Sequence, residues 1–335
     1  RALRLLDRRG GLVYATPAWA EAAARPALRE ALAVVEARGP CVVEAAGGGA
    51  MNHAGSSSGF DPEVMKVVLD AICLEAGVAV RLHTRLVAAL RDPSGERLTH
   101  VVTESKSGRE AWGGKVFIDC TGDGDLGTLA GCGFDMGHPG DGLVQPLSLL
   151  AILTGIELGE VSGFLSDNGL PWGVPHEALR AEVARSGVPT SYSHPTLFRL
   201  TDGLFMLMAN HQYGVPCDDA ASISLATIEA RAEIFRMVRG LQSLGGPWRD
   251  LKLVATSAQI GIREGRRIHG LYTVTAEDVT CGARHEDAVC RATFCVDIHS
   301  TDPKKDKGLG NGGVKSRPYD IPLRALVAKD VDGLL

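Results

Sequence analysis

The sequence predicts a mixed α/β protein with two packed domains, and three observations support that prediction. The chain has 335 residues, of which 45% are apolar, so it can bury more than one hydrophobic core. Between residues 59 and 119 a helical pattern is followed by short strand-like segments. From residue 146 to about residue 256 the predicted segments are longer and less regular, which indicates a second domain.

The most regular predicted helix follows Asp61. Asp61 can cap its first turn, Pro62 suits the first helical position, and Gly77 can end the helix. Its apolar residues share one face: Val64, Val67, Val68, Ala71 and Ile72. A helix over residues 222–242 is predicted from four residues on one side: Ile223, Ala226, Ala230 and Ile234. Residues 1–40 also predict helix, and residues 46–59 predict a flexible loop.

Strand patterns occur in three neighbouring segments, residues 78–90, 97–105 and 115–119. Turns are expected between them, at DPSGE (92–96) and KSGRE (106–110). The pattern therefore predicts a small antiparallel meander followed by one buried strand. Residues 301–317 predict a polar, glycine-rich surface loop, after which the sequence turns apolar again.

The overall charge favours small-molecule chemistry over nucleic-acid or membrane binding. Lys and Arg number 35 against 40 Asp and Glu, a net charge of -5. No run of about eighteen uncharged apolar residues predicts a membrane span. The 8 cysteines show no CxxC pair and no zinc-like spacing, so we expect reduced thiols, no metal site and a cytoplasmic location.

The segment FIDCTGDGDLGTLAG, residues 117–131, is the strongest candidate for a binding site. A strand that ends in Thr121, Gly122 and Asp123 puts a hydroxyl and a carboxylate at the edge where open α/β sheets bind nucleotides. Glycine lets a ligand approach the main chain closely, and threonine or aspartate can hold ribose hydroxyls. On spacing alone, a tight Asp-Gly turn without a ligand, or a weak calcium loop, is an equally good interpretation.

Further segments accompany this motif in a fixed order. GFDPEVMKVVLDAICLEAG and the meander precede it, and QPLSL, GIREGRRIHGLYTV, FCVDIH and YDIPLRALV follow it. Together they resemble the FAD-dependent oxidoreductase family over residues 59–335. That family belongs to the two-dinucleotide-motif flavoproteins, alongside fumarate-reductase-like and heterodisulfide-reductase-A-like proteins.

The resemblance implies FAD as the cofactor and a fold with Rossmann-like FAD-binding layers and an inserted mixed α+β substrate or cap domain. It implies an FAD-binding domain over residues 1–145, a substrate or cap domain over 146–300, and a return to the FAD-binding domain over 301–335. The family's opening Gly-x-Gly-x-x-Gly turn and its closing glycine-arginine segment do not occur in this sequence. We therefore expect a fragment truncated at both ends, which alone binds FAD poorly and is inactive.

The resemblance also implies roles for individual residues. Those expected near the adenosine part of FAD are Thr121, Gly122, Asp123, Asp125 and, through backbone atoms, Leu86 or Val87. Gln145 is expected at the crossing into the second domain, near the flavin ring. A hydrogen-bonded residue at the domain junction is an equal alternative for Gln145.

The segment GIREGRR provides candidate catalytic residues. On a helix, Arg263 would share a side with Arg266 and Arg267. Such guanidinium groups can bind a carboxylate substrate or stabilise negative charge on a reduced flavin. With the resemblance we expect a catalytic Arg263 or Arg267; without it, an ion-paired helix is the better interpretation.

Histidines that follow apolar strands are candidates for proton transfer. His211 and His299 both lie at such positions, where an imidazole can shuttle a proton. A hydrogen-bonded structural role is the more common alternative, and we select His211 as the candidate catalytic histidine. His53 lies in the glycine-serine loop. The order of the segments that resemble the family implies that His53 faces the flavin.

The predicted function is hydride transfer between a small organic substrate and FAD. The alternative is a flavin-carrying electron-transfer subunit of a heterodisulfide-reductase-like complex, without its own substrate site. That association could add a [4Fe–4S] cluster, although the sequence shows no cluster motif. The expected partner is a small molecule, and the sequence leaves open a homo-oligomer or a redox partner protein.

Overall fold

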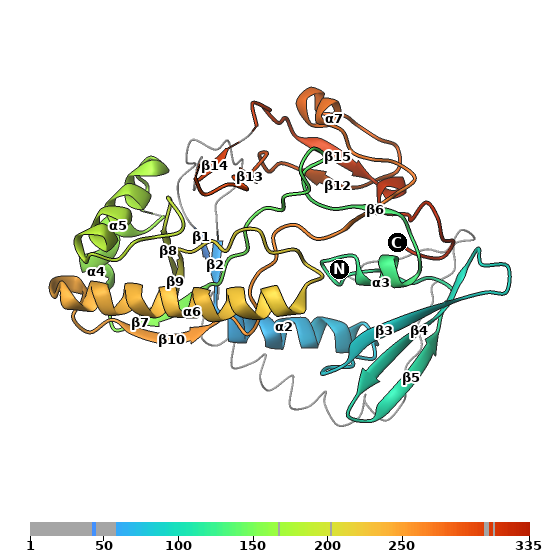
Figure 1. Ribbon diagram of the computed structural model, residues 1–335, viewed down its shortest axis with the longest axis horizontal. Helices are drawn as coiled ribbons and strands as arrows, with labels where there is room; N and C mark the ends of the chain where they lie inside the picture. Colours follow the sequence, from blue (N-terminus) through green and yellow to red (C-terminus); the bar gives the residue numbers. More distant parts are fainter. Residues whose placement is uncertain (1–41, 45–57, 167, 202, 305–307, 311) are drawn as a thin grey trace.

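The computed structural model describes residues 42–44 and 58–335, except residues 167, 202, 305–307 and 311. The helices expected over residues 1–40, almost all of the 46–59 loop and His53 lie outside the described residues. The described part is a mixed α/β fold, which confirms the predicted class (Figure 1). No helix in that part of the chain is long and apolar enough to cross a membrane.

Helix α2 (Pro62–Glu75) confirms the predicted capping pattern. Oδ1 of Asp61 accepts hydrogen bonds from the backbone N–H groups of Glu63 at 2.9 Å and Val64 at 3.3 Å. Ala71 is buried on the predicted apolar face, whereas Ile72 is 55% exposed. The predicted stripe is therefore only partly buried.

An antiparallel sheet follows, with the strands β3 (Arg85–Arg91), β4 (Leu98–Ser105) and β5 (Gly108–Gly113) in the order β3-β4-β5. Figure 1 shows this meander projecting from one end of the molecule. The prediction is wrong for residues 78–84, which are not strand, and for the KSGRE turn, inside which β5 begins. Gly108 has a φ of 92°, so the chain reverses directly after Ser105 and pairs at once.

The segment 115–119 is not a sheet strand, contrary to the prediction. It makes one parallel bridge, between Phe117 and Leu334. The N–H of Phe117 donates to the carbonyl of Gly333 at 2.8 Å, and the N–H of Asp119 donates to the carbonyl of Leu335 at 2.7 Å. Segment 115–119 therefore pairs with residues 333–335 through an isolated bridge and not as a strand of a sheet.

The first hydrophobic core combines segments that are far apart in the sequence. Leu98 contributes from β4, and Leu126 contributes from the short helix α3 (Asp125–Leu129). The last part of the chain supplies Ala328, Val331 and Leu334. The C-terminal residues therefore pack beside the helix that follows the TGDGD motif.

The second hydrophobic core surrounds an antiparallel sheet. Its strands, in order, are β10 (Lys252–Thr256), β7 (Ala151–Thr154), β9 (Leu204–Met208) and β8 (Thr196–Thr201). The long helix α6 (Ala220–Ser243) shares this core and confirms the helix predicted over 222–242 (Figure 1). Ala226, Ala230 and Ile234 are buried on the predicted side.

The other elements are short, apart from the 13-residue helix α5. Around the second core lie α4 (Leu158–Val161), η1 (Ser162–Phe164), α5 (Gly173–Arg185) and η2 (Gly246–Trp248). Three strand pairs are β1 (Val42–Glu44) with β2 (Ser58–Phe60), β6 (Phe134–Asp135) with β11 (Arg267–Ile268), and β12 (Ala288–Ala292) with β15 (Tyr319–Pro322). A fourth pair joins β13 (Ile298–His299) to β14 (Leu309–Gly310), which lies within the predicted 301–317 loop. Helices α7 (Ala276–Cys281) and η3 (Leu323–Ala325) complete the described fold.

Candidate functional site

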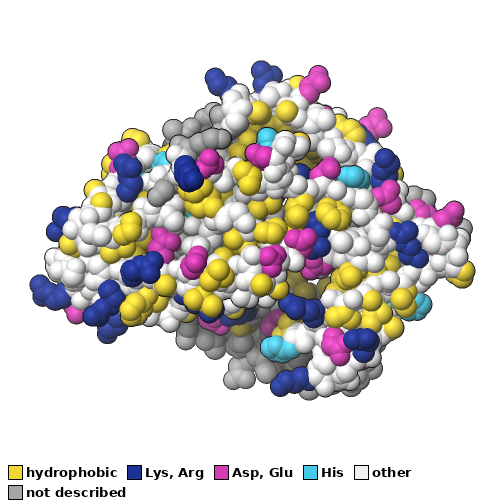
Figure 2. Space-filling model, viewed as in Figure 1, with side chains coloured by type: hydrophobic (Ala, Val, Ile, Leu, Met, Phe, Trp, Pro, Cys, Tyr) yellow, Lys and Arg dark blue, Asp and Glu magenta, His cyan; other side chains and the backbone are white. Residues whose placement is uncertain are grey.

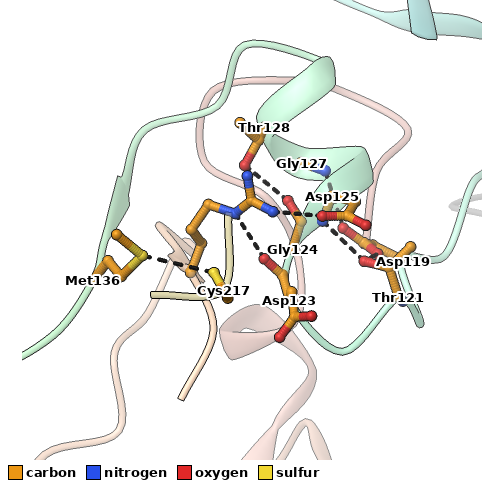
Figure 3. A network of polar contacts seen from close by, with 10 residues as sticks. Asp119, Thr121, Asp123, Gly124, Asp125, Gly127, Thr128, Met136 and Cys217 are labelled. Carbon is orange, nitrogen blue, oxygen red and sulfur yellow. Dashed lines mark hydrogen bonds and ion pairs between the residues drawn. The ribbon is translucent and has the colours of Figure 1, made fainter. Parts of the chain in front are cut away.

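Residues 119–125, called the acidic turn below, form a closed hydrogen-bond network (Figure 3). Oδ1 of Asp119 accepts from the N–H of Thr121 at 3.0 Å and from its hydroxyl at 2.6 Å. Oδ2 of Asp119 accepts from the N–H of Gly127 at 3.0 Å. The Thr121 hydroxyl accepts in turn from the N–H of Asp125 at 2.9 Å. Asp119 therefore fixes the turn, a role that its position at the end of a predicted strand did not reveal.

Gly122 and Gly265 determine how closely other groups can approach the acidic turn. Gly122 has a φ of 85°, and a Cβ there would meet no atom within 4 Å, so the main chain is open to a ligand. By contrast, a Cβ on Gly265 would lie 2.7 Å from Cα of Asp123. The segment GIREGRR therefore packs directly against the acidic turn at Gly265.

Arg266 holds the acidic turn from the side. Its Nε donates to the carbonyl of Asp123 at 2.9 Å, and its guanidinium pairs with the carboxylate of Asp125. The carboxylate of Asp123 accepts no hydrogen bond from the residues that the structure describes. Burial raises the pKa of this carboxyl, and the charge of Asp125 adds to the rise. The Asp123 carboxylate is thus available to a ligand.

These features fit the FAD expected from the sequence. An open glycine main chain and an available carboxylate can hold ribose hydroxyls, whereas the Thr121 hydroxyl is already engaged in shaping the turn. A register shift between Leu86 and Ala88 makes Val87 the extra residue of a β-bulge in β3. A bulge residue is left out of the regular ladder, which suits the backbone contact expected of Val87.

Gln145 joins segments from different parts of the chain. Its N–H donates to Oε2 of Glu264 at 3.0 Å, and its Oε1 accepts from the N–H of His299 at 2.8 Å. Arg267 pairs with Oε1 of Glu264 at 2.6 Å and donates to the carbonyl of Gly137 at 2.8 Å. The Arg267 side chain is 47% exposed and the Glu264 side chain 16%, so the pair joins a surface arginine to a partly buried glutamate. Gln145 therefore makes the bonds of a junction residue.

The helix predicted for GIREGRR is wrong, because the segment is extended. Gly261 exchanges backbone hydrogen bonds with Ser148 at 2.8 and 3.1 Å, and the short strand β11 begins at Arg267. These long-range bonds take the place of the i to i−4 bonds that a helix needs. Arg263 and Arg266 consequently reach different neighbours instead of sharing a side.

Arg263 belongs to a second group of side chains, called the histidine cluster below: Tyr192, His211, Tyr213, Arg263 and His299. The ring centroids of His211 and His299 are 4.9 Å apart, and the ring of Tyr192 lies 4.1 Å from that of His211. His211 and His299 are only 2% and 3% exposed. The structure thus brings together three residues that the sequence marked and adds two tyrosines from loops that no pattern marked.

Hydrogen bonds fix the tautomer of His211. Its backbone N–H donates to Oγ of Ser191 at 2.8 Å, and its Nδ1 lies 3.2 Å from the hydroxyl of Tyr213. Because that hydroxyl can donate to the carbonyl of Ser191 at 3.2 Å, we assign the ring proton of His211 to Nδ1. Burial lowers the pKa of His211 to about 3, with contributions from His299 and Arg263. Nε2 of His211 is therefore a neutral acceptor.

Three buried nitrogens of the cluster have no hydrogen-bond partner in the described structure: Nε2 of His211, Nδ1 of His299 and Nε of Arg263. Arg263 forms no ion pair with any described carboxylate, and its Nη2 lies 3.4 Å from the hydroxyl of Ser148. Burial lowers the pKa of Arg263, and the charge of Asp297 opposes that shift. Buried polar atoms without partners are costly, so a polar ligand would be stabilised here.

The described residues show no alternative metal centre. Among them, no group of three or more His, Cys, Asp or Glu side chains could hold a metal ion. The described cysteines are free thiols: Cys73, Cys120, Cys132, Cys217, Cys281, Cys290 and Cys295.

Comparison with known proteins gives one extensive match. The family model described as FAD dependent oxidoreductase matches residues 10–335. No curated protein matches the chain. Among solved structures, BexE, studied for oxidation during BE-7585A biosynthesis, is 15% identical with a TM-score of 0.41, covering 73% of this chain and 44% of BexE.

Two further solved structures are similar at the same level. A geranylgeranyl bacteriochlorophyll reductase-like protein (Ta0516) from Thermoplasma acidophilum is 9% identical with a TM-score of 0.40, covering 66% of this chain and 45% of that one. Aklavinone-11 hydroxylase, solved with FAD and aklavinone, is 13% identical with a TM-score of 0.34, covering 67% and 36%. The chain thus spans less than half the length of these three structures.

Similarity to these structures is too low to argue activity or substrate from them. The family model, in contrast, covers nearly the whole chain. It confirms the resemblance found in the sequence, and with it FAD as the cofactor. The chain belongs to the FAD dependent oxidoreductase family.

Proposed function

We propose that this chain transfers hydride between a small organic substrate and FAD, bound between the acidic turn and the histidine cluster. The path of residues 261–267 is the observation that carries the proposal. Arg263 lies among the unpartnered atoms of the histidine cluster, and Gly265 packs against Asp123 of the acidic turn. One short segment therefore contacts both the expected nucleotide edge and a buried polar group.

We further propose that residues 1–145 and 301–335 form the FAD-binding domain and residues 146–300 the substrate or cap domain. The two hydrophobic cores support this division. The first combines Leu98 and Leu126 with Val331 and Leu334, and the second is built from residues between Leu147 and Ile260. A substrate would then lie where the two domains meet.

In this proposal, the acidic turn holds the adenosine part of FAD. Gly122 gives the ligand access to the main chain, and the carboxylate of Asp123 accepts hydrogen bonds from ribose hydroxyls. Thr121 keeps the turn in shape, Asp125 anchors Arg266 against it, and Val87 offers backbone atoms. FAD, when bound, supplies a hydride acceptor.

On the substrate side, His211 and Arg263 are the proposed catalytic residues. Nε2 of His211 accepts or returns the substrate proton, and Tyr213 keeps that nitrogen free by bonding Nδ1. Arg263 provides positive charge in a partly buried position, where burial lowers its pKa. Arg267 contributes through Glu264, which holds the main chain of Gln145 near the expected flavin ring.

The test of this proposal is FAD binding and reduction in the full-length protein. We expect a yellow protein whose flavin is reduced anaerobically by a small organic donor, and a correctly folded but colourless protein contradicts the proposal. Asp123→Asn should weaken FAD binding by at least about tenfold, since a charge-assisted hydrogen bond is lost. Asp70→Asn on the exposed side of α2 is the matched control, and equal losses in both variants would remove Asp123 from the site.

A second candidate is the electron-transfer subunit, and one observation favours it. Leu225, Ile228 and Phe235 on α6 are 57%, 61% and 58% exposed, and their spacing puts them on one side of the helix. Figure 2 shows hydrophobic side chains among charged ones on this face of the molecule. If FAD is reduced only by a partner protein that protects α6, and by no small molecule, this candidate replaces the enzyme.

A further inference from the structure

Arg263 is partly buried and forms no ion pair with a described carboxylate, although the charge of Asp297 acts on it from a distance. Its Nε is shielded from solvent and has no hydrogen-bond partner in the described structure. An isolated charge inside a protein is expensive unless an opposite charge meets it. A guanidinium has a planar fork that matches a carboxylate, so an anionic ligand group would satisfy it best.

Beside Arg263, His211 offers a hydrogen-bond acceptor and His299 a second buried nitrogen without a described partner. The proton on Nδ1 of His211 is directed to Tyr213, which leaves a lone pair on Nε2. Nδ1 of His299 is buried and has no hydrogen-bond partner in the described structure, and Oδ1 of Asp297 lies 3.4 Å from Nε2 of the same ring. A ligand for this cluster therefore needs an anionic group together with a hydrogen-bond donor.

We propose that the histidine cluster binds a hydroxy acid, with Arg263 pairing with the carboxylate and Nε2 of His211 facing the hydroxyl. The proposal rests on the proposed function, since the hydroxyl carbon must face the flavin. A cationic amine is disfavoured, because it would bring a second positive charge to Arg263. A neutral alcohol would leave the guanidinium unpaired.

Oxidation of the hydroxy acid requires an acceptor for a hydride and an acceptor for a proton. The C–H and O–H bonds of the hydroxyl-bearing carbon break, and a C=O bond forms. With FAD bound, the hydride and its electron pair would pass to the oxidised flavin, and Nε2 of His211 would accept the proton. The hydroxy acid would thereby become an oxo acid, with FAD as the two-electron oxidant.

Binding of a carboxylate at Arg263 should also raise the pKa of His211. The groups facing His211 are Tyr192 and His194 before β8, Tyr213 after β9, Arg263 after β10, and Asp297 and His299 at β13. Burial is the main cause of the low pKa of His211, and the charges of His299 and Arg263 lower it further. A carboxylate that neutralises Arg263 removes the contribution of Arg263, so the pKa of His211 rises when the substrate is bound. Nε2 of His211 is therefore a stronger base when the hydroxy acid is bound than when the site is free of it.

Acetate tests the anion site without turnover, and acetamide is its neutral control. In FAD-loaded protein with ¹⁵N-labelled histidine, acetate should raise the pKa of His211 as followed by NMR, and acetamide should not. Arg263→Gln should weaken acetate binding by at least about tenfold. Arg263→Lys keeps the charge and should retain part of the response, while Arg239→Gln on the exposed side of α6 should retain all of it. Equal effects of acetate and acetamide, or a full response in Arg263→Gln, would overturn the proposal.

Reduction of the bound flavin separates this proposal from the proposed function. Glycolate and ethane-1,2-diol have similar size and differ in charge. We expect glycolate to bleach the oxidised flavin at least about tenfold faster. Equal rates overturn the hydroxy-acid proposal but leave hydride transfer standing. If dithionite reduces the flavin but no organic donor does, the proposed function fails, and the step fails with it even where acetate binds.

Discussion

The acidic turn and the histidine cluster differ in how their polar atoms are satisfied. In the turn, both carboxylate oxygens of Asp119 accept hydrogen bonds, and the Thr121 hydroxyl both donates and accepts. In the cluster, three buried nitrogens have no described partner. The turn therefore satisfies its own polar side chains and leaves the main chain of Gly122 open, whereas we propose that a ligand satisfies the unpartnered atoms of the cluster. The first arrangement suits a resident cofactor, and the second suits a substrate.

The largest expected effect concerns the buried His211. Its pKa in the folded protein is about 3, below its ordinary 6.5, so the unfolded chain binds more protons between these values. The free energy of unfolding therefore falls as pH drops from 6.5 towards 3, by roughly 2–3 kcal/mol at pH 4. Urea titrations of wild type and His211→Gln at pH 7 and pH 4 measure this. Substitution should flatten the pH dependence.

His100→Gln is the matched control for that measurement, because His100 is exposed on β4. It should show the acid sensitivity of the wild type. An identical pH dependence in His211→Gln and wild type would mean that His211 is not held neutral by burial, and the contrast between cluster and turn would weaken.

The next largest effect is expected when the contact between Gly265 and the acidic turn is broken. Gly265→Ala puts a Cβ 2.7 Å from Cα of Asp123, so the backbone must shift. We expect a loss of about 1–3 kcal/mol in unfolding free energy, together with release of FAD. Gly173→Ala in α5 is the control, because a Cβ there meets nothing within 4 Å. Normal stability and full FAD content in Gly265→Ala would show that residues 261–267 do not hold the turn.

Asp119→Asn tests whether the turn is self-sufficient. The amide keeps one acceptor oxygen, so its NH2 group would face either the N–H of Thr121 or the N–H of Gly127, and that N–H would lose its acceptor. The expected cost is about 1–2 kcal/mol in unfolding free energy, with weaker FAD binding as the turn loosens. Thermal unfolding with and without added FAD measures both. If stability is unchanged but FAD binding is lost, Asp119 contacts the cofactor itself, and the turn is not self-sufficient.

The smallest effect is expected at the surface of the junction. Glu264→Gln removes the ion pair with Arg267, whose side chain is 47% exposed. Such pairs contribute less than about 1 kcal/mol, so unfolding free energy should change little. Glu63→Gln, which removes the exposed pair with Lys66, is the reference. A loss in Glu264→Gln several times that in Glu63→Gln would show that the bond to Gln145 carries the difference.

Local patterns predicted those parts of the fold that depend on local contacts. The Asp61 cap, helix α6 and strand β4 are confirmed, because capping and hydrophobic period are properties of neighbouring residues. The GIREGRR helix was wrong because Gly261 pairs with Ser148, far away in sequence. The same limit applies to segment 115–119, whose partners are the last residues of the chain.

In the candidate site, too, the sequence predicted individual residues but not the long-range contacts between them. His211 and His299 were predicted as candidates because they follow apolar strands. Arg263 was predicted as a candidate because it lies in an arginine-rich segment. Nothing in the sequence could show that these three residues meet, since they come from different elements. Tyr192 lies in a loop before β8 without any periodic pattern, so it was missed. Asp119 was missed because a strand-ending aspartate gives no sign of the bonds that it accepts.

Hydrogen–deuterium exchange of the full-length protein with and without FAD tests most directly whether the turn and the cluster face one flavin. We predict that FAD slows exchange of amides in residues 119–127 and also in residues 263–267 and 297–300. Protection of the first segment alone would contradict this account, because the histidine cluster would then lie away from the cofactor.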